Sequence, residues 1–387
     1  MLREKKILLC VTGGIAIYKS LDLASMLVKV GAVVKTIMTK SAMELVTPLS
    51  FKSITHETVS YKMFDTDAPI HHISLSDWAD LVVVAPATAN TISKLACGIA
   101  DDLLTTTILA CKAPKLIVPA MNVNMWENPI FQDNLDKLKR YGFRVLEPEV
   151  GRLACGVVGK GRMPAPTEIM YAIRSVLLNK TNLNDKKILI TAGATVEHID
   201  PMRYITNVSS GKMGLSLARA AALCGADVTI VHGKVSETLP YYTHNIQALS
   251  AQDMYHEVMK ISDDFDIIIM CAAVADYTPE TPSSQKLKKH TNLTLNLIRT
   301  NDILAELGKK KKQILIGFAA ESENLIKNAR QKLINKNLDM IITNDIRNAG
   351  ENDTEVVILK ASDTVEIQVR GDKFEVAMRI FDEAGKL

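Results

Sequence analysis

The chain begins the same structural pattern twice. The segments "KKILLCVTGG" at 5–14 and "KKILITAGAT" at 186–195 each predict a short buried strand that runs into a turn of small residues. A helical pattern follows each of them, at 16–30 and 212–225, and each helix leads into another apolar strand, "AVVKTIMT" or "ADVTIVHG". Two βαβ openings in one chain predict two doubly wound α/β domains, each built on a largely parallel sheet.

A polar stretch separates the two patterns. The segment "LNKTNLND" at 178–185 lacks apolar periodicity, which is typical of a linker, so we expect domains over residues 1–181 and 186–387. Near-continuous apolar runs predict further strands covered on both faces, at 80–88, 115–121, 265–277, 313–321 and 338–345. The alternating tail at 355–369 predicts an antiparallel hairpin. Ligands of open α/β sheets bind beyond the carboxyl ends of strands, so a site is expected there.

Charge and cysteine content narrow the class of protein. The 387 residues carry 46 Lys and Arg against 43 Asp and Glu, and a net charge of +3 gives no reason to expect nucleic acid as a partner. Six cysteines without a CxxC pair argue against a zinc site or a disulfide framework and favour a reducing, cytoplasmic location. The apolar run near the start is broken by two glycines, which indicates a strand rather than a signal peptide. No apolar stretch is long enough to span a membrane, so no membrane partner is expected.

Small and polar residues follow two strands of the first half. Gly13 and Gly14 form a turn before a helix, an arrangement that binds one phosphate. The turn is not GxGxxG, and no acidic residue suited to a ribose follows the second strand, so a mononucleotide is favoured over a dinucleotide. The segment "APATANT" at 85–91 offers hydroxyl and amide groups to a phosphate or a heterocycle, although Thr88 or Asn90 is also explained as a helix N-cap.

Three further side-chain types are candidates for chemistry in the first half. Asn122 of "PAMNVNMW" follows another strand, where an uncharged amide can bind a carboxylate. His71 and His72 are candidate bases, although a lone histidine is usually structural. The glycine-rich segment "GRLACGVVGKGRM" at 151–163 carries Cys155, which is either a small apolar filler or a thiol on a flap that closes over a ligand.

The second half contains a motif suited to an anionic substrate. The segment "HIDPMRYITNVSSGKMG" at 198–214 combines Arg203, Asn207, two serines and a glycine-lysine turn before a helix. Lysine-rich segments at 286–290 and 332–336 can neutralise a phosphorylated ligand, whereas the four lysines at 309–312 are more typical of a solvated face.

Motifs along the whole chain resemble a known enzyme family. "GGIAIYK", "HISL", "ADLVVVAPATANT", "PAMNVNMW" and "ACGVVGKGRM" occur in this order in the flavin-dependent cysteine decarboxylases. The second half, with "TAGATVEHIDPMRYITNVSSGKMG", "AAVADY", "GFAAE" and "KLINKN", looks like phosphopantothenate–cysteine ligase. End to end, the chain resembles the bacterial bifunctional phosphopantothenoylcysteine decarboxylase/phosphopantothenate–cysteine ligases of coenzyme A synthesis. The resemblance implies two Rossmann-like domains, a flavodoxin-like flavoprotein domain and a C-terminal ligase domain.

For the first half, the resemblance implies FMN and a set of site residues. His72 would lie near the reacting cysteinyl group, Asn122 would hold the substrate carboxylate, and Cys155 would sit on a mobile substrate clamp. Oxidation of the CH2–SH group to a thioaldehyde by FMN would provide the electron sink that loss of CO2 needs, with neither metal nor pyridoxal lysine. The implied FMN contacts are Gly13, Gly14, Thr39, Ser41, Pro86, Ala87, Thr88 and Asn90.

For the second half, the resemblance implies CTP and Mg2+, whose protein ligands stay unassigned. The carboxylate of 4′-phosphopantothenate would become an acyl-cytidylate, and the amine of cysteine would then displace CMP. Asn207 would contact the acyl intermediate and Arg203 would assist. The implied CTP contacts are Met270, Cys271, Ala272, Asp276, Lys286, Asn301, Asp302, Ile303, Leu304, Phe318, Lys332 and Lys336. One departure stands out, because Thr300-Asn301 replaces the usual Asn-Pro before Asp302, which puts the local loop shape in doubt.

Two other functions stay open from the residues alone. One is a tandem oxidoreductase that uses NAD(P), which the missing dinucleotide fingerprints disfavour. The other is an inactive binding protein on this fold, which would be expected to have lost His72, Asn122, Cys155 or Asn207, all of which are present. The resemblance further implies a homo-oligomer, a dodecamer of decarboxylase trimers with ligase dimers, whose only ligands are small molecules.

Overall fold

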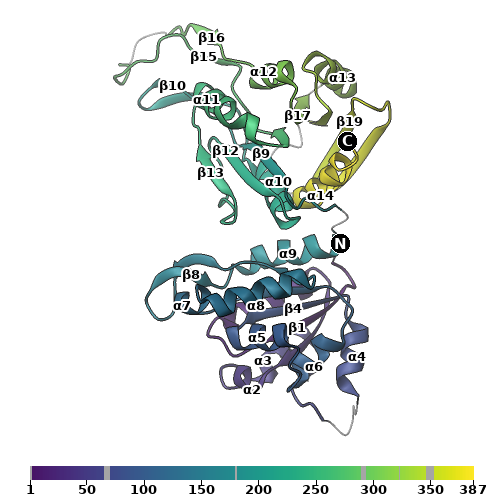
Figure 1. Ribbon diagram of the computed structural model, residues 1–387. Helices are drawn as coiled ribbons and strands as arrows, with labels where there is room; N and C mark the ends of the chain where they lie inside the picture. Colours follow the sequence, from purple (N-terminus) through teal and green to yellow (C-terminus); the bar gives the residue numbers. More distant parts are fainter. Residues whose placement is uncertain (1, 65–69, 179–180, 289–292, 322, 346–352) are drawn as a thin grey trace. The chain divides into compact units, whose positions relative to one another are not determined.

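The computed structural model divides the chain into two compact units, Met1–Leu178 and Asn179–Leu387 (Figure 1). Residues 179 and 180 of the predicted linker, and 289 and 290 of the lysine-rich segment, lie outside the described residues. The structure describes residues 2–64, 70–178, 181–288, 293–321, 323–345 and 353–387.

The first unit is built on a parallel sheet with the strand order β3-β2-β1-β4-β5-β6. Its described strands are β1 (Lys6–Val11), β2 (Val33–Met38), β3 (Val59–Ser60), β4 (Leu81–Ala87), β5 (Lys115–Pro119) and β6 (Arg144–Val145). All seven residues of β4 are buried, as expected for a strand covered by helices on both faces. A separate antiparallel hairpin joins β7 (Glu149–Arg152) to β8 (Val158–Arg162).

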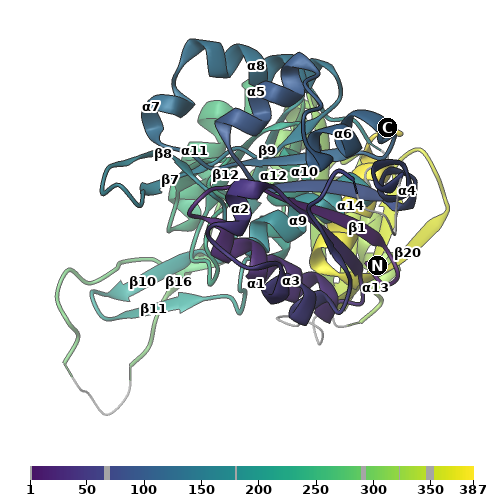
Figure 2. The ribbon, with the colours of Figure 1, turned by 90° about the horizontal axis from the view of Figure 1, so that it is seen from below.

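Helices cover the two faces of this sheet (Figure 2). On one face, α1 (Ile17–Lys29) packs against α3 (Pro48–Thr55) and α9 (Pro166–Leu178). On the other, Leu8 and Cys10 of β1 and Val82 and Val84 of β4 share a core with the helices that follow β3 to β5. Those helices are α4 (His71–Trp78), α5 (Ala89–Cys97), α6 (Leu103–Ala110) and α8 (Pro129–Arg140); two short helices, α2 (Lys40–Met43) and α7 (Val123–Trp126), complete the unit as described.

The second unit repeats the plan on a larger, mixed sheet with the order β13-β12-β9-β14-β17-β18-β19-β20. The last two pairings are antiparallel, so the hairpin predicted at 355–369 is confirmed and lies at the sheet edge. Its strands are β9 (Lys187–Ala192), β12 (Asp227–His232), β13 (His244–Gln247), β14 (Ile267–Met270), β17 (Ile314–Glu321), β18 (Met340–Asp345), β19 (Asp353–Lys360) and β20 (Glu366–Asp372).

Of the helices in the described part of this unit, two pack on one face of the sheet and three pack on the other. The first face carries α10 (Lys212–Leu223) and α14 (Lys373–Ala384). The second carries α11 (Ala251–Ile261), α12 (Ile303–Lys310) and α13 (Leu325–Asn335), with the 3-10 turn η1 (Ser262–Asp264) after α11. Two small antiparallel pairs lie outside the sheet: β10 (Val196–Asp200) with β11 (Arg203–Thr206), and β15 (Tyr277–Pro279) with β16 (Leu297–Arg299).

The fold class is confirmed, and one predicted strand is wrong in extent. The apolar run at 265–277 forms β14 only over Ile267–Met270, and the chain re-enters a strand at Tyr277. The reason is a change of hydrogen-bond partner. The N–H groups of Cys271 and Ala272 bond to the hydroxyl of Thr191 (3.1 Å each) instead of to a neighbouring strand. Within the part of the chain that the structure describes, we find no helix with the length and apolar character needed to cross a membrane.

Candidate active sites at two switch points

In the first unit, the order of the strands reverses at β1, which lies between β2 and β4. The loops after β1 and β4 therefore leave toward opposite faces, and the carboxyl edge between them is where open α/β sheets bind their ligands, a position called the crevice below. The buried hydroxyl of Thr12 holds the two loops together: it donates to the carbonyl of Pro86 (2.6 Å) and accepts from the N–H of Thr88 (3.1 Å). This edge brings together the turn and strand-end residues that the sequence predicted as a mononucleotide site.

Gly13 lies where the loop after β1 meets the segment after β2. A Cβ atom on Gly13 would lie 2.4 Å from the Cβ of Ser41, so no larger residue fits without a shift of the backbone. Thr39, at the end of β2, accepts a hydrogen bond from the N–H of Ala42 (3.2 Å) and caps α2. The structure thus places Gly13 against Ser41, two residues after Thr39, and their contact with FMN stays a prediction.

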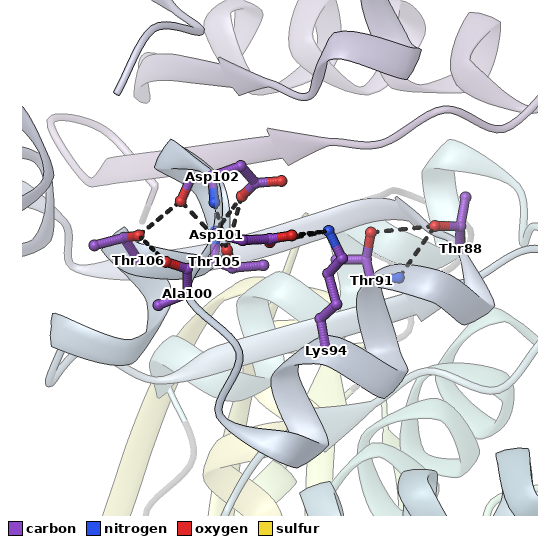
Figure 3. Close-up of polar contacts among 8 residues, drawn as sticks. All are labelled: Thr88, Thr91, Lys94, Ala100, Asp101, Asp102, Thr105 and Thr106. Carbon is purple, nitrogen blue, oxygen red and sulfur yellow. Dashed lines mark hydrogen bonds and ion pairs between the residues drawn. The ribbon is translucent and has the colours of Figure 1, made fainter. Parts of the chain in front are cut away.

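Thr88 caps the helix that follows β4, so the N-cap interpretation of this residue is confirmed. Its hydroxyl accepts from the N–H of Thr91 (3.4 Å) and lies 3.1 Å from the Thr91 hydroxyl (Figure 3). Further along, Lys94 of α5 pairs with Asp101 (Nζ to Oδ2, 2.7 Å), away from the crevice end of the helix (Figure 3). Asn90 is exposed in the first turn of α5. One threonine can cap a helix and still line a ligand site, because a hydroxyl oxygen has two lone pairs.

The residues at this edge suit a phosphate-bearing mononucleotide. Helix α1 begins at Ile17 without a side-chain cap and without an acidic residue in its first turn. The N–H groups of Ile17 and Lys19 donate to the carbonyls of Gly14 and Ala16 (3.0 Å each), so among the described contacts of this turn the N–H of Tyr18 is the one left for an anion. The three segments that form the edge, 11–16, 38–43 and 85–91, contain no Asp or Glu. These three segments therefore bring no carboxylate to the edge that would repel a phosphate.

The structure brings Asn122 and Cys155 together. Asn122 caps α7, with its Oδ1 accepting from the N–H of Asn124 (2.9 Å), and its Nδ2 donates to Sγ of Cys155 (3.4 Å). The N–H of Val157 contributes most to lowering the pKa of the Cys155 thiol, burial opposes it, and the Asn122 amide adds to the lowering. Cys155 is exposed in the turn between β7 and β8, which contradicts the interpretation of it as a buried apolar filler.

The glycines of this hairpin permit close packing. A Cβ on Gly159 would lie 2.8 Å from a methyl of Val123, and one on Gly161 would lie 2.3 Å from the carbonyl oxygen of Met121. Strand β8 therefore lies directly against the segment that carries Asn122. At the base of the hairpin, the buried Nζ of Lys19 donates to the carbonyl of Met163. Burial, and then the charge of Arg162, lower the pKa of Lys19.

The two neighbouring histidines have different surroundings. His71 Nε2 lies 3.1 Å from the hydroxyl of Ser60, a contact that fixes the start of α4. His72 is half-buried in the same first turn. Among the described residues, hydrogen bonds connect His72 to neither Asn122 nor Cys155, so its proximity to the reacting group stays a prediction.

The second unit has an equivalent switch point at β9, between β12 and β14. Two threonines tie the loop after β14 to β9 and the loop that follows it. Thr191 accepts from the N–H groups of Cys271 and Ala272, and Thr195 accepts from the N–H of Ala275 (2.9 Å). Burial raises the pKa of the Cys271 thiol to about 12, which keeps it an uncharged lining group.

Asn207 reaches the same loop from the segment before α10. Its Nδ2 donates to the carbonyl oxygens of Val274 (3.1 Å) and Ala273 (3.5 Å). The structure therefore places Asn207 beside the predicted nucleotide contacts at 270–272. Asp276, farther along this loop, is exposed, and Phe318 lies half-buried on β17, one residue beyond the partner of Met270 in the strand pairing.

A buried carboxylate that the sequence did not single out organises the hairpin that carries Arg203. Asp200 Oδ1 accepts from the N–H groups of Met202 and Arg203 (2.8 Å each), and Oδ2 accepts from Arg203 Nη1 (2.5 Å) and the N–H of Leu287 (3.1 Å). Burial alone would raise the pKa of Asp200, but these N–H groups and the guanidinium lower it further than burial raises it. Its only signal in the sequence is its place three residues before Arg203.

The other predicted CTP contacts divide into surface and core residues. Asp302 caps α12 by accepting from the N–H of Ala305 (3.0 Å), and it pairs with Lys336 (2.7 Å). Ile303 and Leu304 are buried in the core beneath the helix, so only their backbone can face a ligand. Lys286 is exposed, as is Asn301, whose amide donates to Gln252 (3.1 Å). Over the described residues, we find no cluster of three or more metal-ligating side chains.

Comparisons with known proteins match both halves. Residues 1–178 match the family described as Flavoprotein, and residues 183–387 match the DNA/pantothenate metabolism flavoprotein C-terminal domain. The chain is 46% identical over 399 residues to the coenzyme A biosynthesis bifunctional protein CoaBC of Bacillus subtilis, covering 100% of this chain and 98% of that relative. Identity is 43% over 384 residues to the CoaBC protein of Borreliella burgdorferi, covering 98% of each chain. For the CoaBC protein of Escherichia coli it is 41% over 353 residues, covering 89% of this chain and 87% of the relative. Because both halves are matched in the same order along the whole length, the chain belongs to the family of coenzyme A biosynthesis bifunctional proteins CoaBC.

Proposed function

We propose that this chain carries out two consecutive steps of coenzyme A synthesis. The half at 186–387 joins cysteine to 4′-phosphopantothenate with CTP, and the half at 1–181 removes CO2 from the product to give 4′-phosphopantetheine, with FMN. The observation that carries the proposal is the contact between Asn122 and Cys155. It lies in the same unit as the switch point at β1, whose loops suit a mononucleotide. A carboxylate-binding amide and an acidic thiol are what decarboxylation followed by protonation requires.

In the decarboxylase half, the residues of the crevice divide the work. The N–H of Tyr18 at the start of α1 and the turn at Gly13 and Gly14 would hold the FMN phosphate, and Thr39, Ser41 and the 86–90 segment would border the rest. When bound, FMN would supply the two-electron acceptor and donor that the CH2–SH group of the substrate needs. Asn122 has a second amide hydrogen for the substrate carboxylate, which it holds without protonating.

Protonation after CO2 loss is assigned to Cys155. The carbon that carried the carboxylate needs one proton, and the Sγ–H of Cys155 supplies it while Asn122 and the N–H of Val157 stabilise the thiolate that remains. Cys155→Ser keeps the size but is a far weaker acid. The variant should oxidise and decarboxylate, then stall with a product two hydrogens lighter than phosphopantetheine, detected by mass spectrometry under anaerobic conditions. Formation of the fully reduced product at the normal rate would exclude the thiol as the donor.

In the ligase half, Asn207 and the loop at 271–275 form the acyl-transfer site. Asn207 is held by two carbonyl oxygens, so its amide plane is fixed before the acyl-cytidylate forms. CTP would use the 270–272 and 301–304 segments with Lys286, Lys332 and Lys336, and Mg2+ would bind chiefly through the triphosphate oxygens, as is usual for nucleotide-bound Mg2+. A cytoplasmic homo-oligomer, with decarboxylase trimers joined through ligase dimers, completes the proposal and is tested by the mass of the particle in solution.

The complete proposal is tested by one reconstituted reaction. The purified chain is incubated with 4′-phosphopantothenate, cysteine, CTP and Mg2+, and mass spectrometry should find 4′-phosphopantetheine, CMP and pyrophosphate. Omission of CTP should abolish the product, and supplying 4′-phosphopantothenoylcysteine should restore it without nucleotide. A chain that binds flavin but forms none of these products would support the inactive binding protein instead.

A further inference from the structure

We propose that Asp200 is a positioning residue of the ligase reaction, which holds Arg203 so that one edge of its guanidinium faces the substrate's anionic oxygens. This inference rests on the proposed ligase function and on the role of Arg203 in it. Asp200 has a fully buried side chain, whereas the Arg203 side chain is 43% exposed. The pair therefore has one end fixed inside the protein and one end open to solvent.

The contacts of the Arg203 guanidinium show which edge is open. Nη1 donates to Oδ2 of Asp200 (2.5 Å) and to the carbonyl of Leu287 (3.3 Å), which uses both of its hydrogens. Among the described residues, Nε and Nη2 have no hydrogen-bond partner. These two nitrogens form the side-on edge that binds a carboxylate or a phosphate with two parallel hydrogen bonds.

Asp200 also fixes the segment that carries Lys286. The N–H of Leu287 donates to Oδ2 of Asp200 (3.1 Å), and the carbonyl of the same residue accepts from Arg203. Nearby, the N–H of Ser283 donates to the carbonyl of Ile199 (2.9 Å). One carboxylate thus sets the positions of Arg203 and of the backbone next to Lys286, two cations that approach the ligand from segments more than eighty residues apart in sequence.

The test uses the full-length chain, the ligase reaction and a double-mutant cycle. Asp200→Asn keeps the size of the side chain but cannot accept hydrogen bonds at all four positions. It should lower kcat/KM for 4′-phosphopantothenate by about tenfold to a hundredfold, the loss expected for a charge-assisted hydrogen bond, mainly through KM and with KM for CTP unchanged. In the Arg203→Ala background, Asp200→Asn should cause a clearly smaller loss than in the wild-type chain, because the part of its effect that acts through Arg203 is already gone and only the contact with the backbone beside Lys286 remains.

Controls separate positioning from stability. Glu197→Gln, at another buried carboxylate of β10 that accepts only from the N–H of Ala251 among the described contacts, should leave the ligase kinetics unchanged. If Asp200→Asn does not fold, Asp200→Glu carries the same test, because it keeps the charge and displaces Arg203. Pantothenate, which has the carboxylate of the substrate but not its phosphate, shows which of the two anions Arg203 binds. If its inhibition constant is unchanged in Asp200→Asn, the open edge of Arg203 binds the phosphate. If pantothenate and 4′-phosphopantothenate are weakened equally, the edge binds the carboxylate.

The outcomes that overturn the proposal are distinct from failure of the function. A chain that releases no CMP from CTP refutes the ligase function, and wild-type kinetics in Arg203→Ala refutes the role of Arg203. If both hold, the inference about Asp200 is overturned by a wild-type KM in Asp200→Asn, or by losses that simply add in the double mutant.

Discussion

The hydroxyl of Thr12 should control flavin affinity without being required to touch the flavin. Thr12 is 1% exposed and joins the loops after β1 and β4 through hydrogen bonds to Pro86 and Thr88. Thr12→Val keeps the shape of the side chain and leaves a buried carbonyl and an N–H without partners. A buried group left unpaired costs roughly 1–3 kcal/mol, and the carbonyl of Pro86 is the more buried of the two. We therefore expect a loss of about 2 kcal/mol, which corresponds to a roughly 30-fold weaker affinity for FMN if the loops part at the site.

The same sheet offers a matched control. Thr36 on β2 is also 1% exposed, and its hydroxyl has no hydrogen-bond partner among the described residues. Burying this unpaired hydroxyl already costs free energy in the wild type, and Thr36→Val removes that cost. The substitution should therefore be neutral or stabilise the fold by up to about 1 kcal/mol. Thr12→Ser keeps the hydroxyl and should bind FMN nearly as well as the wild type. FMN dissociation constants come from titration of the apoprotein by flavin fluorescence, and unfolding free energies come from denaturant melts.

The ligase half of each variant serves as an internal reference. CTP-dependent release of CMP should be the same in Thr12→Val, Thr12→Ser and Thr36→Val, because these residues lie in the first unit. If Thr12→Val binds FMN as tightly as Thr36→Val does, the loops do not depend on this hydroxyl and the reasoning is refuted.

Three further predictions follow from the described contacts. Asn207→Asp points a carboxylate at two backbone carbonyls and at the acyl group, so attack by cysteine should slow more than activation by CTP, with acyl-cytidylate accumulating in a quenched-flow assay. A fragment of residues 1–181 should fold, bind FMN and decarboxylate 4′-phosphopantothenoylcysteine without nucleotide; a folded fragment without flavin would show that the domain boundary is wrong. Because the N–H of Val157 and then the amide of Asn122 lower the pKa of Cys155, its alkylation should set in at a lower pH than that of an ordinary cysteine, and Asn122→Ala should move the midpoint up. The decarboxylase, which needs the protonated thiol, should correspondingly lose activity as pH rises through that lowered value, and an alkylation midpoint that does not move in Asn122→Ala would contradict the assignment.

The strands and the order of the sheet follow from local sequence, whereas the contacts that shape the sites do not. Apolar runs such as "LVVVA" predict buried strands because a sheet covered on both faces has no solvated side. The hydrogen bonds of Thr12 and Asp200 join residues 76 and 87 positions apart, and no periodicity marks such partners. The run at 265–277 fails for a related reason: hydrophobicity reports burial, and it does not report whether the N–H groups bond to a strand or to a threonine hydroxyl.

The glycines around Cys155 have two different roles: two of them allow close packing, and one allows a backbone conformation with positive φ. Glycine in a sequence suggests freedom of the backbone, and on that basis the segment is expected to be a flap. Gly159 and Gly161 instead lie where a Cβ would strike Val123 and Met121, so strand β8 is held against the segment of Asn122 by close packing. Gly156, at a φ of +86° with open space around it, lies in the turn next to Cys155, where the backbone needs a conformation that other residues rarely adopt. We therefore expect any closing motion to be confined to the turn that carries the thiol, because packing fixes the base of the hairpin against the segment of Asn122.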